Sequence, residues 1–138
     1  MNEIKEANFN EGNFERANLK RFNFKEDNLI GADLIKANLK CSNLRGARLH
    51  KADLRESNLK ETNRERANLI KANLQGANLR WANLEGANLE GANFEGANLS
   101  GAHYLSFDQL SKAKTLRNKK LNSNIFKSLK EKHLTLFE

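Results

Sequence analysis

The sequence predicts an all-β solenoid, a rod of short stacked coils, over most of its length. Three regularities predict it. An apolar centre recurs at every fifth residue from Ile4 to Tyr104, a small residue stands two places before most centres, and glycine recurs two places after many of them. Of the 21 centres 14 are Leu and four are Phe, and Ala fills 14 of the 21 small positions. This uninterrupted register leaves few ways to bury the apolar side chains.

A period of five fits neither a helix nor a plain strand. Successive centres of a helix would lie about 140° apart around the cylinder and share no common face. In a strand the small residue and the centre of one unit face the same side, but the next small residue lies an odd three positions on. Each pentapeptide is therefore predicted to be a short extended piece followed by a corner, with its small residue and its centre facing the inside of a coil.

Glycine and asparagine support the corners. Seven of the eight glycines stand two places after a centre, where a type II turn requires the positive φ that glycine adopts at little cost. Asn precedes the centre in 16 of the 21 units, and its side chain can bond the local backbone.

The triplets Ala82-Asn83-Leu84 and Ala52-Asp53-Leu54 resemble the A(D/N)LXX units of the pentapeptide-repeat family. The resemblance covers about residues 2–106. It implies a right-handed, quadrilateral β-helix with four pentapeptides per coil and about five coils in all. Residues 20 apart should then stack, so that neighbouring coils share one narrow core.

The period ends after Tyr104, which predicts two regions: a β-helix over residues 1–106 and a helical capping segment over 107–138. Ser106 to Gln109 have the form of a capping box, so a short helix should follow. Ala113 to Leu116, with Leu121, keep a five-residue apolar spacing that predicts a partial coil, and Ser123 is expected to start a second helix. The segment Leu110 to Leu121 resembles the C-terminal extensions of some bacterial members of the family.

Several residues depart from the repeat. Arg64 stands where Leu is usual, so either the coil distorts there or the side chain escapes to solvent, because an unpaired charge inside a Leu stack is costly. Phe22 and Asp27 replace Ala. Aromatic residues are also frequent in the first two coils, and we expect them either to cover the first edge or to mediate end-to-end association into a homodimer. The candidate edge contacts are Phe9, Phe14, Phe22 and Phe24.

The outer positions predict one interaction surface. Lys20, Lys40, Lys60 and Arg80 should form a basic ladder on one side, with Trp81 exposed beside its end. From Ala82 to Ser106 there is no Lys or Arg, while glutamates recur there. The rod is therefore expected to be electrically polarised along its axis.

Sequence motifs for chemistry are missing. No metal-ligand, nucleophile or redox motif contains His50, His103, His133 or the single Cys41. We therefore expect the chain to have no catalytic, metal-binding or cofactor-binding residues. The sequence has no apolar run long enough for a membrane span, and a cytoplasmic location is expected. The formal charge of +7 lies mostly in the tail, where residues 107–138 hold eight Lys and Arg against three Asp and Glu.

These observations favour a non-catalytic binding or scaffold protein with a protein partner. Two alternatives stay open. Some members of the family are acidic DNA mimics that interact with DNA gyrase, a type II topoisomerase, although this chain is basic. The tail and the Lys20 to Arg80 ladder could instead bind nucleic acid or an anionic surface.

Overall fold

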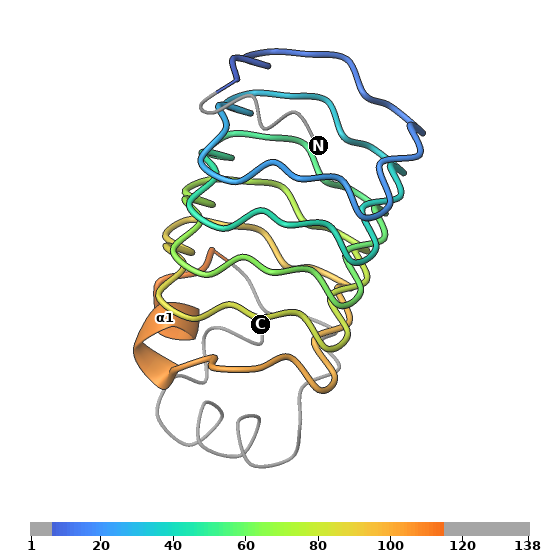
Figure 1. Cartoon of the computed structure of the whole chain (residues 1–138). Coiled ribbons are helices and arrows are strands. Elements are labelled where there is room, and N and C mark those ends of the chain that lie inside the picture. The colour runs from blue at the N-terminus through green and yellow to red at the C-terminus, as the bar shows by residue number, and fades with distance from the viewer. Residues whose placement is uncertain (1–6, 115–138) are drawn as a thin grey trace.

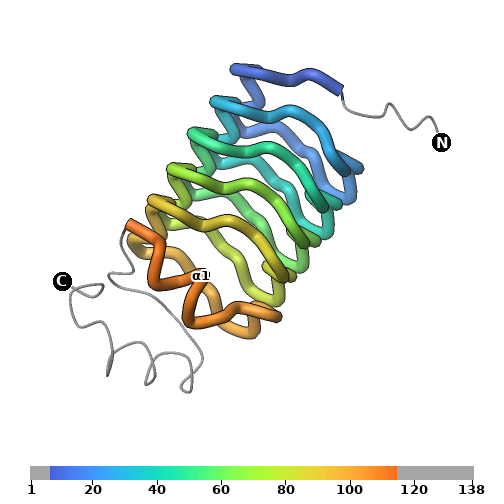
Figure 2. The backbone as a smooth tube through the Cα atoms, turned by 90° about the vertical axis from the view of Figure 1, so that its left-hand side faces the viewer, coloured from blue at the N-terminus to red at the C-terminus, as the bar shows by residue number. Residues whose placement is uncertain are grey.

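The computed structural model describes residues 7–114, which form a regular stack of coils closed at one end by a helix (Figure 1). Residues 7–103 make a right-handed quadrilateral β-helix of about five coils. The helix is α1, Phe107–Ser111. Successive coils lie one above another in even steps along the rod (Figure 2), as the repeat predicts.

Parallel pairing holds the coils together. The described residues form 16 parallel bridges, and every bridge joins residues 20 positions apart. At each bridge a centre donates to the next coil along the chain, as when the Leu44 N–H donates to the Asn63 carbonyl at 2.7 Å. The Asn63 N–H in turn donates to the Ser42 carbonyl at 3.1 Å. Each side of a coil pairs at a single residue, so within residues 7–114 the strands are no longer than one bridge.

The corners have the predicted geometry. The seven corner glycines have φ between 64° and 70°, the left-handed region that a side chain disfavours. The asparagine before each centre bonds the backbone two residues on; for example, Asn43 Oδ1 accepts from the Arg45 N–H at 3.1 Å. This bond repeats with nearly constant length around the coils and supplies a partner to a backbone that is mostly turn.

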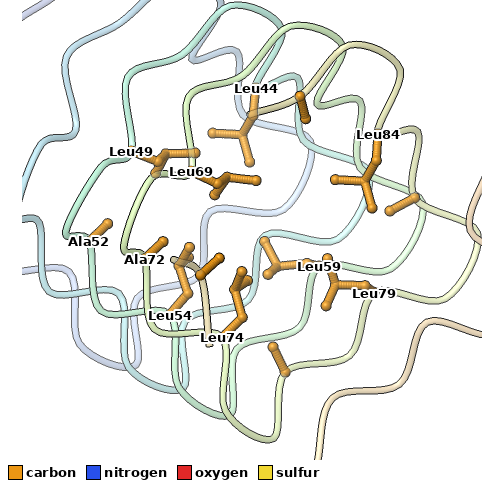
Figure 3. Close-up of a cluster of buried hydrophobic side chains, with 14 of the residues drawn as sticks. Leu44, Leu49, Ala52, Leu54, Leu59, Leu69, Ala72, Leu74, Leu79 and Leu84 are labelled. Carbon is orange, nitrogen blue, oxygen red and sulfur yellow. The ribbon is translucent and has the colours of Figure 1, made fainter. Parts of the chain in front are cut away.

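Leucine and alanine fill the interior. The labelled side chains in Figure 3 point inward from all sides of the coil, and none of the labelled leucines is more than marginally exposed. Leu54 and Leu74, 20 residues apart, are both fully buried. The prediction that centres and small residues share one narrow core is confirmed for these coils.

The helix closes the last coil. Ser106 Oγ accepts from the Gln109 N–H at 3.0 Å, and Gln109 Oε1 accepts from the Ser106 N–H at 2.9 Å, which confirms the predicted capping box. Gln109 Nε2 also donates to the carbonyls of Leu84 and Ala87, at 2.7 and 3.0 Å. At the Ala87 carbonyl it takes the place of the backbone donor that a following coil supplies elsewhere, as the Asn88 N–H does for the Ala67 carbonyl.

The last centre of the repeat does not stack as expected. Tyr104 was expected to stack on Leu84, but its side chain is 69% exposed. The pairing ends at His103, and the chain turns into α1, whose Leu110 is fully buried instead. The chain then rejoins the ladder, because the Lys114 N–H donates to the Ala92 carbonyl at 2.9 Å.

The later part of the tail lies outside the described residues. Three expectations therefore stay predictions: the partial coil beyond residue 114, the helix from Ser123, and the absence of a chemical role for His133. So does the division of the chain into regions 1–106 and 107–138.

Candidate interaction surface

The structure brings the predicted ladder residues together at one corner of the rod. We call this the cationic corner; it consists of the residue pairs 20–21, 40–41, 60–61, 80–81 and 100–101. The bridges from Asn18 through Asn38, Asn58 and Asn78 to Asn98 place these pairs above one another. Lys20 and Arg80 are exposed, and Lys40 and Lys60 are partly exposed.

The corner charges are segregated on the rod. Among the described corner residues, the cationic corner has five cations and one carboxylate: Lys20, Arg21, Lys40, Lys60 and Arg80 against Glu61. The other three corners are balanced, with three cations and three carboxylates, two and two, and three and three. The excess positive charge of the described corners therefore lies on one edge.

Ion pairing reinforces this difference. On the other corners cations contact carboxylates, as in Arg45–Glu65 at 3.5 Å and Lys36–Glu56 at 3.8 Å. On the cationic corner only Lys60 has such a contact within residues 7–114, with Glu61 at 3.5 Å. Hence Lys20, Lys40 and Arg80 have no carboxylate of the described chain within 4 Å.

Glu61 is the one acidic group of the cationic corner. Its carboxylate accepts from the Cys41 thiol at 3.4 Å, and this bond, followed by the nearby Lys60 and Lys40 charges, lowers the pKa of Glu61. The carboxylate is thus held in its charged form beside Lys60. Cys41 is a free, partly exposed thiol.

Aromatic rings lie at the end of the cationic corner nearest α1. Trp81 is 47% exposed, and its ring lies over Gly101, where an added Cβ would overlap it. The centroids of Trp81 and His103 are 6.2 Å apart, as are those of His103 and Tyr104. We call these three residues the aromatic strip. The sequence pattern indicated Trp81 alone. His103 and Tyr104 join it because the regular pairing ends at His103, and the repeat by itself does not predict where the pairing ends.

Arg64 departs from both outcomes that its position predicted. The coil is not distorted: the Arg64 N–H donates to the Asn83 carbonyl at 2.8 Å, and the Arg64 carbonyl accepts from the Ala67 N–H at 3.0 Å. The side chain does not escape either, since it is fully buried. None of its guanidinium nitrogens has a hydrogen-bond acceptor within residues 7–114. Burial lowers the pKa of Arg64 to about 9. Regular ladder bonds on both sides hold the backbone in place and so hold the side chain inside.

The phenylalanines of the first coils pack together. Phe24 is buried, while Phe9 and Phe14 are partly buried against the core. Phe9 meets Phe14 and Phe24 edge-on, with centroids 5.7 and 5.8 Å apart. Phe22 packs on the outer side of this cluster: it is 47% exposed, and the centroid of its ring lies 4.5 Å from that of Phe24. The cluster covers part of the first described coil and leaves Phe22 available for contact.

Asp27 occupies an inward position usually taken by Ala. It is buried, and its Oδ1 accepts from the Ala7 N–H at 2.9 Å. Desolvation by burial raises the pKa of Asp27, and the bond from Ala7 opposes this in part. The Asp27 carboxyl therefore occupies an interior site that usually holds Ala, and desolvation disfavours its charged form there.

The described chain offers little to support catalysis. Residues 7–114 hold no group of three His, Cys, Asp or Glu arranged to bind a metal ion. A depression of about 430 Å³ is lined by Lys71, Ala72, Asn73, Gly91, Asn93 and Lys114; it is open to solvent, and no carboxylate or imidazole lines it. No helix in the described part of the chain is long and apolar enough to cross a membrane.

Together, the stacked coils, the inward leucines and the helical cap define a four-sided β-solenoid that displays its polar side chains on faces and corners. A family model described as pentapeptide repeats matches eight copies in residues 28–63 and 65–101, just over half of the chain. The chain belongs to the pentapeptide-repeat family. The two matched segments are separated by Arg64 alone.

Several solved structures are similar. The chain is 34% identical to alr5209, a pentapeptide repeat protein from Nostoc PCC 7120, covering 86% of each chain with a TM-score of 0.40. It is 29% identical to Rfr23 from the cyanobacterium Cyanothece 51142, covering 84% of this chain and 88% of that one, with a TM-score of 0.39. It is 18% identical to trypsin-treated QnrB1, a plasmid-mediated fluoroquinolone resistance protein, covering 91% and 74%, with a TM-score of 0.45. None of the curated proteins compared with the chain matches it.

Proposed function

We propose that the protein is a non-catalytic binding scaffold, a rigid rod that presents fixed rows of side chains to a protein partner. The segregation of charge carries the proposal: three corners are balanced, and one carries five cations against Glu61. A stack held by a bond at every bridge fixes these rows in space, so a partner can be bound without the entropic cost of ordering a loop. A cytoplasmic location is part of the proposal and agrees with the free thiol of Cys41.

Affinity purification from the native host tests the proposal. The full chain, tagged and immobilised, should retain a protein that binds the purified chain saturably at physiological salt. The proposal fails if every retained protein is released by moderate salt and none binds the purified chain saturably. Turnover of a small-molecule substrate by the purified chain would also contradict it.

Self-association is a narrower form of the same proposal. Exposed Phe22 at the first described coils supports an end-to-end contact, and contacts through the cap would serve the same purpose. Light scattering at high concentration should then report a dimer that Phe22→Ala weakens. A monomer at every concentration would remove this form and leave the scaffold proposal intact.

The gyrase alternative has less support. A DNA mimic needs rows of carboxylates, whereas the described corners are balanced or cationic. We therefore expect the purified chain to leave the supercoiling activity of gyrase unchanged at physiological salt, and tight binding to gyrase would revive the alternative.

A further inference from the structure

The cationic corner has a spacing that suits one kind of partner. Its pairs repeat once per coil, about 4.8 Å apart, so Lys20, Lys40, Lys60 and Arg80 span about 14 Å along the rod. Side chains on one face of an α-helix, at i, i+3 or i+4, and i+7, recur about every 5 Å. Four carboxylates at i, i+3, i+7 and i+10 therefore cover about 15 Å, which matches the four cations within the reach of a lysine side chain.

An extended peptide fits less well. Side chains on one face of a strand are about 6.7 Å apart, so four of them span about 20 Å. The fourth carboxylate would then pass Arg80 and approach the acidic end of the rod. Glu85 and Glu95 lie there, on corners of the next coil.

The surface also disfavours a long polyanion. Proteins that bind single-stranded nucleic acid combine a basic groove with several aromatic platforms, whereas these cations occupy one column on a convex edge. Glu61 interrupts that column, and Glu85 and Glu95 lie beyond it. A partner with a few carboxylates that end near Arg80 avoids this repulsion, and a continuous phosphate backbone does not.

The aromatic strip completes the surface. Trp81 projects from the same corner as Arg80 and leans over Gly101 towards His103. It thus presents a half-exposed indole about one coil beyond the last cation. In a helix lying along the corner, this position corresponds to a residue one turn beyond the last carboxylate, at about i+14. An apolar side chain there would bury the exposed part of the indole.

We propose that the cationic corner binds an acidic α-helix of a protein partner, with carboxylates at i, i+3, i+7 and i+10 on the four cations and an apolar residue one turn later on the aromatic strip. The inference rests on the proposed function, since it names the surface and the partner chemistry of that scaffold. Lys20, Lys40 and Arg80 are the main contacts because no described carboxylate neutralises them. Lys60 is shared with Glu61.

Two synthetic helical peptides of equal composition test the proposal against the full chain. One has glutamates at i, i+3, i+7 and i+10 and a leucine at i+14; the other has the same residues spread around the helix. Trp81, the one tryptophan of the chain, reports binding by its fluorescence. The aligned peptide should bind about 10-fold more tightly than the spread one and shift the Trp81 emission to the blue.

Matched variants locate the site. Changing the four cations to Gln should weaken the aligned peptide about 10-fold or more. The control changes four exposed cations of the other corners to Gln: Lys36, Lys51, Arg66 and Lys71. It removes the same charge and should leave affinity within about 2-fold. We call the protein with the four cations changed to Gln the ladder variant. Gln75 occupies the same place in its pentapeptide, the first residue after the centre, so the ladder variant should fold. A melting curve will verify this.

A further variant tests the apolar contact. We choose Trp81→Gly because glycine readily adopts the φ of 61° at this corner. Fluorescence anisotropy of a labelled peptide should show that this variant binds the aligned peptide more weakly than the wild type does. Its affinity for a peptide that lacks the leucine should be unchanged. Equal binding of the aligned and spread peptides, or unchanged binding by the ladder variant, would overturn the inference. So would a short single-stranded DNA that binds more tightly than the aligned peptide at physiological salt. If a partner recovered by affinity purification binds the ladder variant unchanged, the scaffold proposal stands and this inference alone fails.

Discussion

Replacing Arg64 by leucine should make the protein markedly more stable. In the folded chain the guanidinium is fully buried with no acceptor among residues 7–114, and burial lowers its pKa well below the usual value for arginine, to about 9. Each unit of pKa corresponds to about 1.4 kcal/mol, so burial of the charged form costs about 5 kcal/mol at neutral pH. Arg64→Leu removes this cost and restores the leucine column between Leu44 and Leu84. Urea unfolding should show a gain of several kcal/mol, and the melting temperature should rise by roughly 10 to 20 °C.

The same reasoning fixes a pH dependence. Because the folded pKa of Arg64 lies below its unfolded value, the destabilisation is complete below about pH 9 and shrinks as the pH rises from there towards the unfolded pKa. The stability gap between Arg64→Leu and the wild type should therefore be smaller at pH 11 than at pH 7. The control is Arg48→Leu, an exposed arginine, which should change stability by less than about 0.5 kcal/mol. An Arg64→Leu protein no more stable than the wild type, or a gap that stays constant with pH, would refute the argument.

Three further changes test the core, a buried acid and the cap. Leu79→Ala should lower the free energy of unfolding by about 2 to 5 kcal/mol, and a loss below about 1 kcal/mol would mean that the column collapses around the gap. The raised pKa of Asp27 gives stability that is present below its unfolded pKa and lost as pH rises through the folded value. Denaturation from pH 3 to 7 should therefore show Asp27→Asn gaining on the wild type, and a constant difference would contradict this. Gln109→Ala leaves the Ala87 carbonyl without its donor and removes the second donor of the Leu84 carbonyl, which keeps the Ala87 N–H; calorimetry should show a loss of about 1 to 3 kcal/mol, against little change for exposed Gln75→Ala.

The repeat predicts most of the fold because its information is local and periodic. Leu54 and Leu74 could be placed one above the other from their numbers alone, and the positive φ of Gly76 follows from its place in the unit. The ladder from Lys20 to Arg80 was predictable for the same reason.

The exceptions depend on the whole stack. Desolvation alone predicts that Arg64 moves outward or bends the coil, but regular bonds to the coils on either side hold its backbone in register. Tyr104 continues the period in sequence, yet within residues 7–114 no further coil receives its ring, and Leu110 fills the end of the described core instead. The contact of Trp81 with Gly101 joins two coils and so lies outside any single unit.

The constant 20-residue offset also restricts how such a chain can change in length. Duplication of one full circuit would extend the rod and preserve every vertical alignment. Gain or loss of a single pentapeptide would instead rotate everything beyond it by a quarter turn. Such a change between Lys40 and Lys60 would divide the four cations between two edges. Insertions are therefore neutral for the surface only in whole circuits, although the interior would accept either kind equally well.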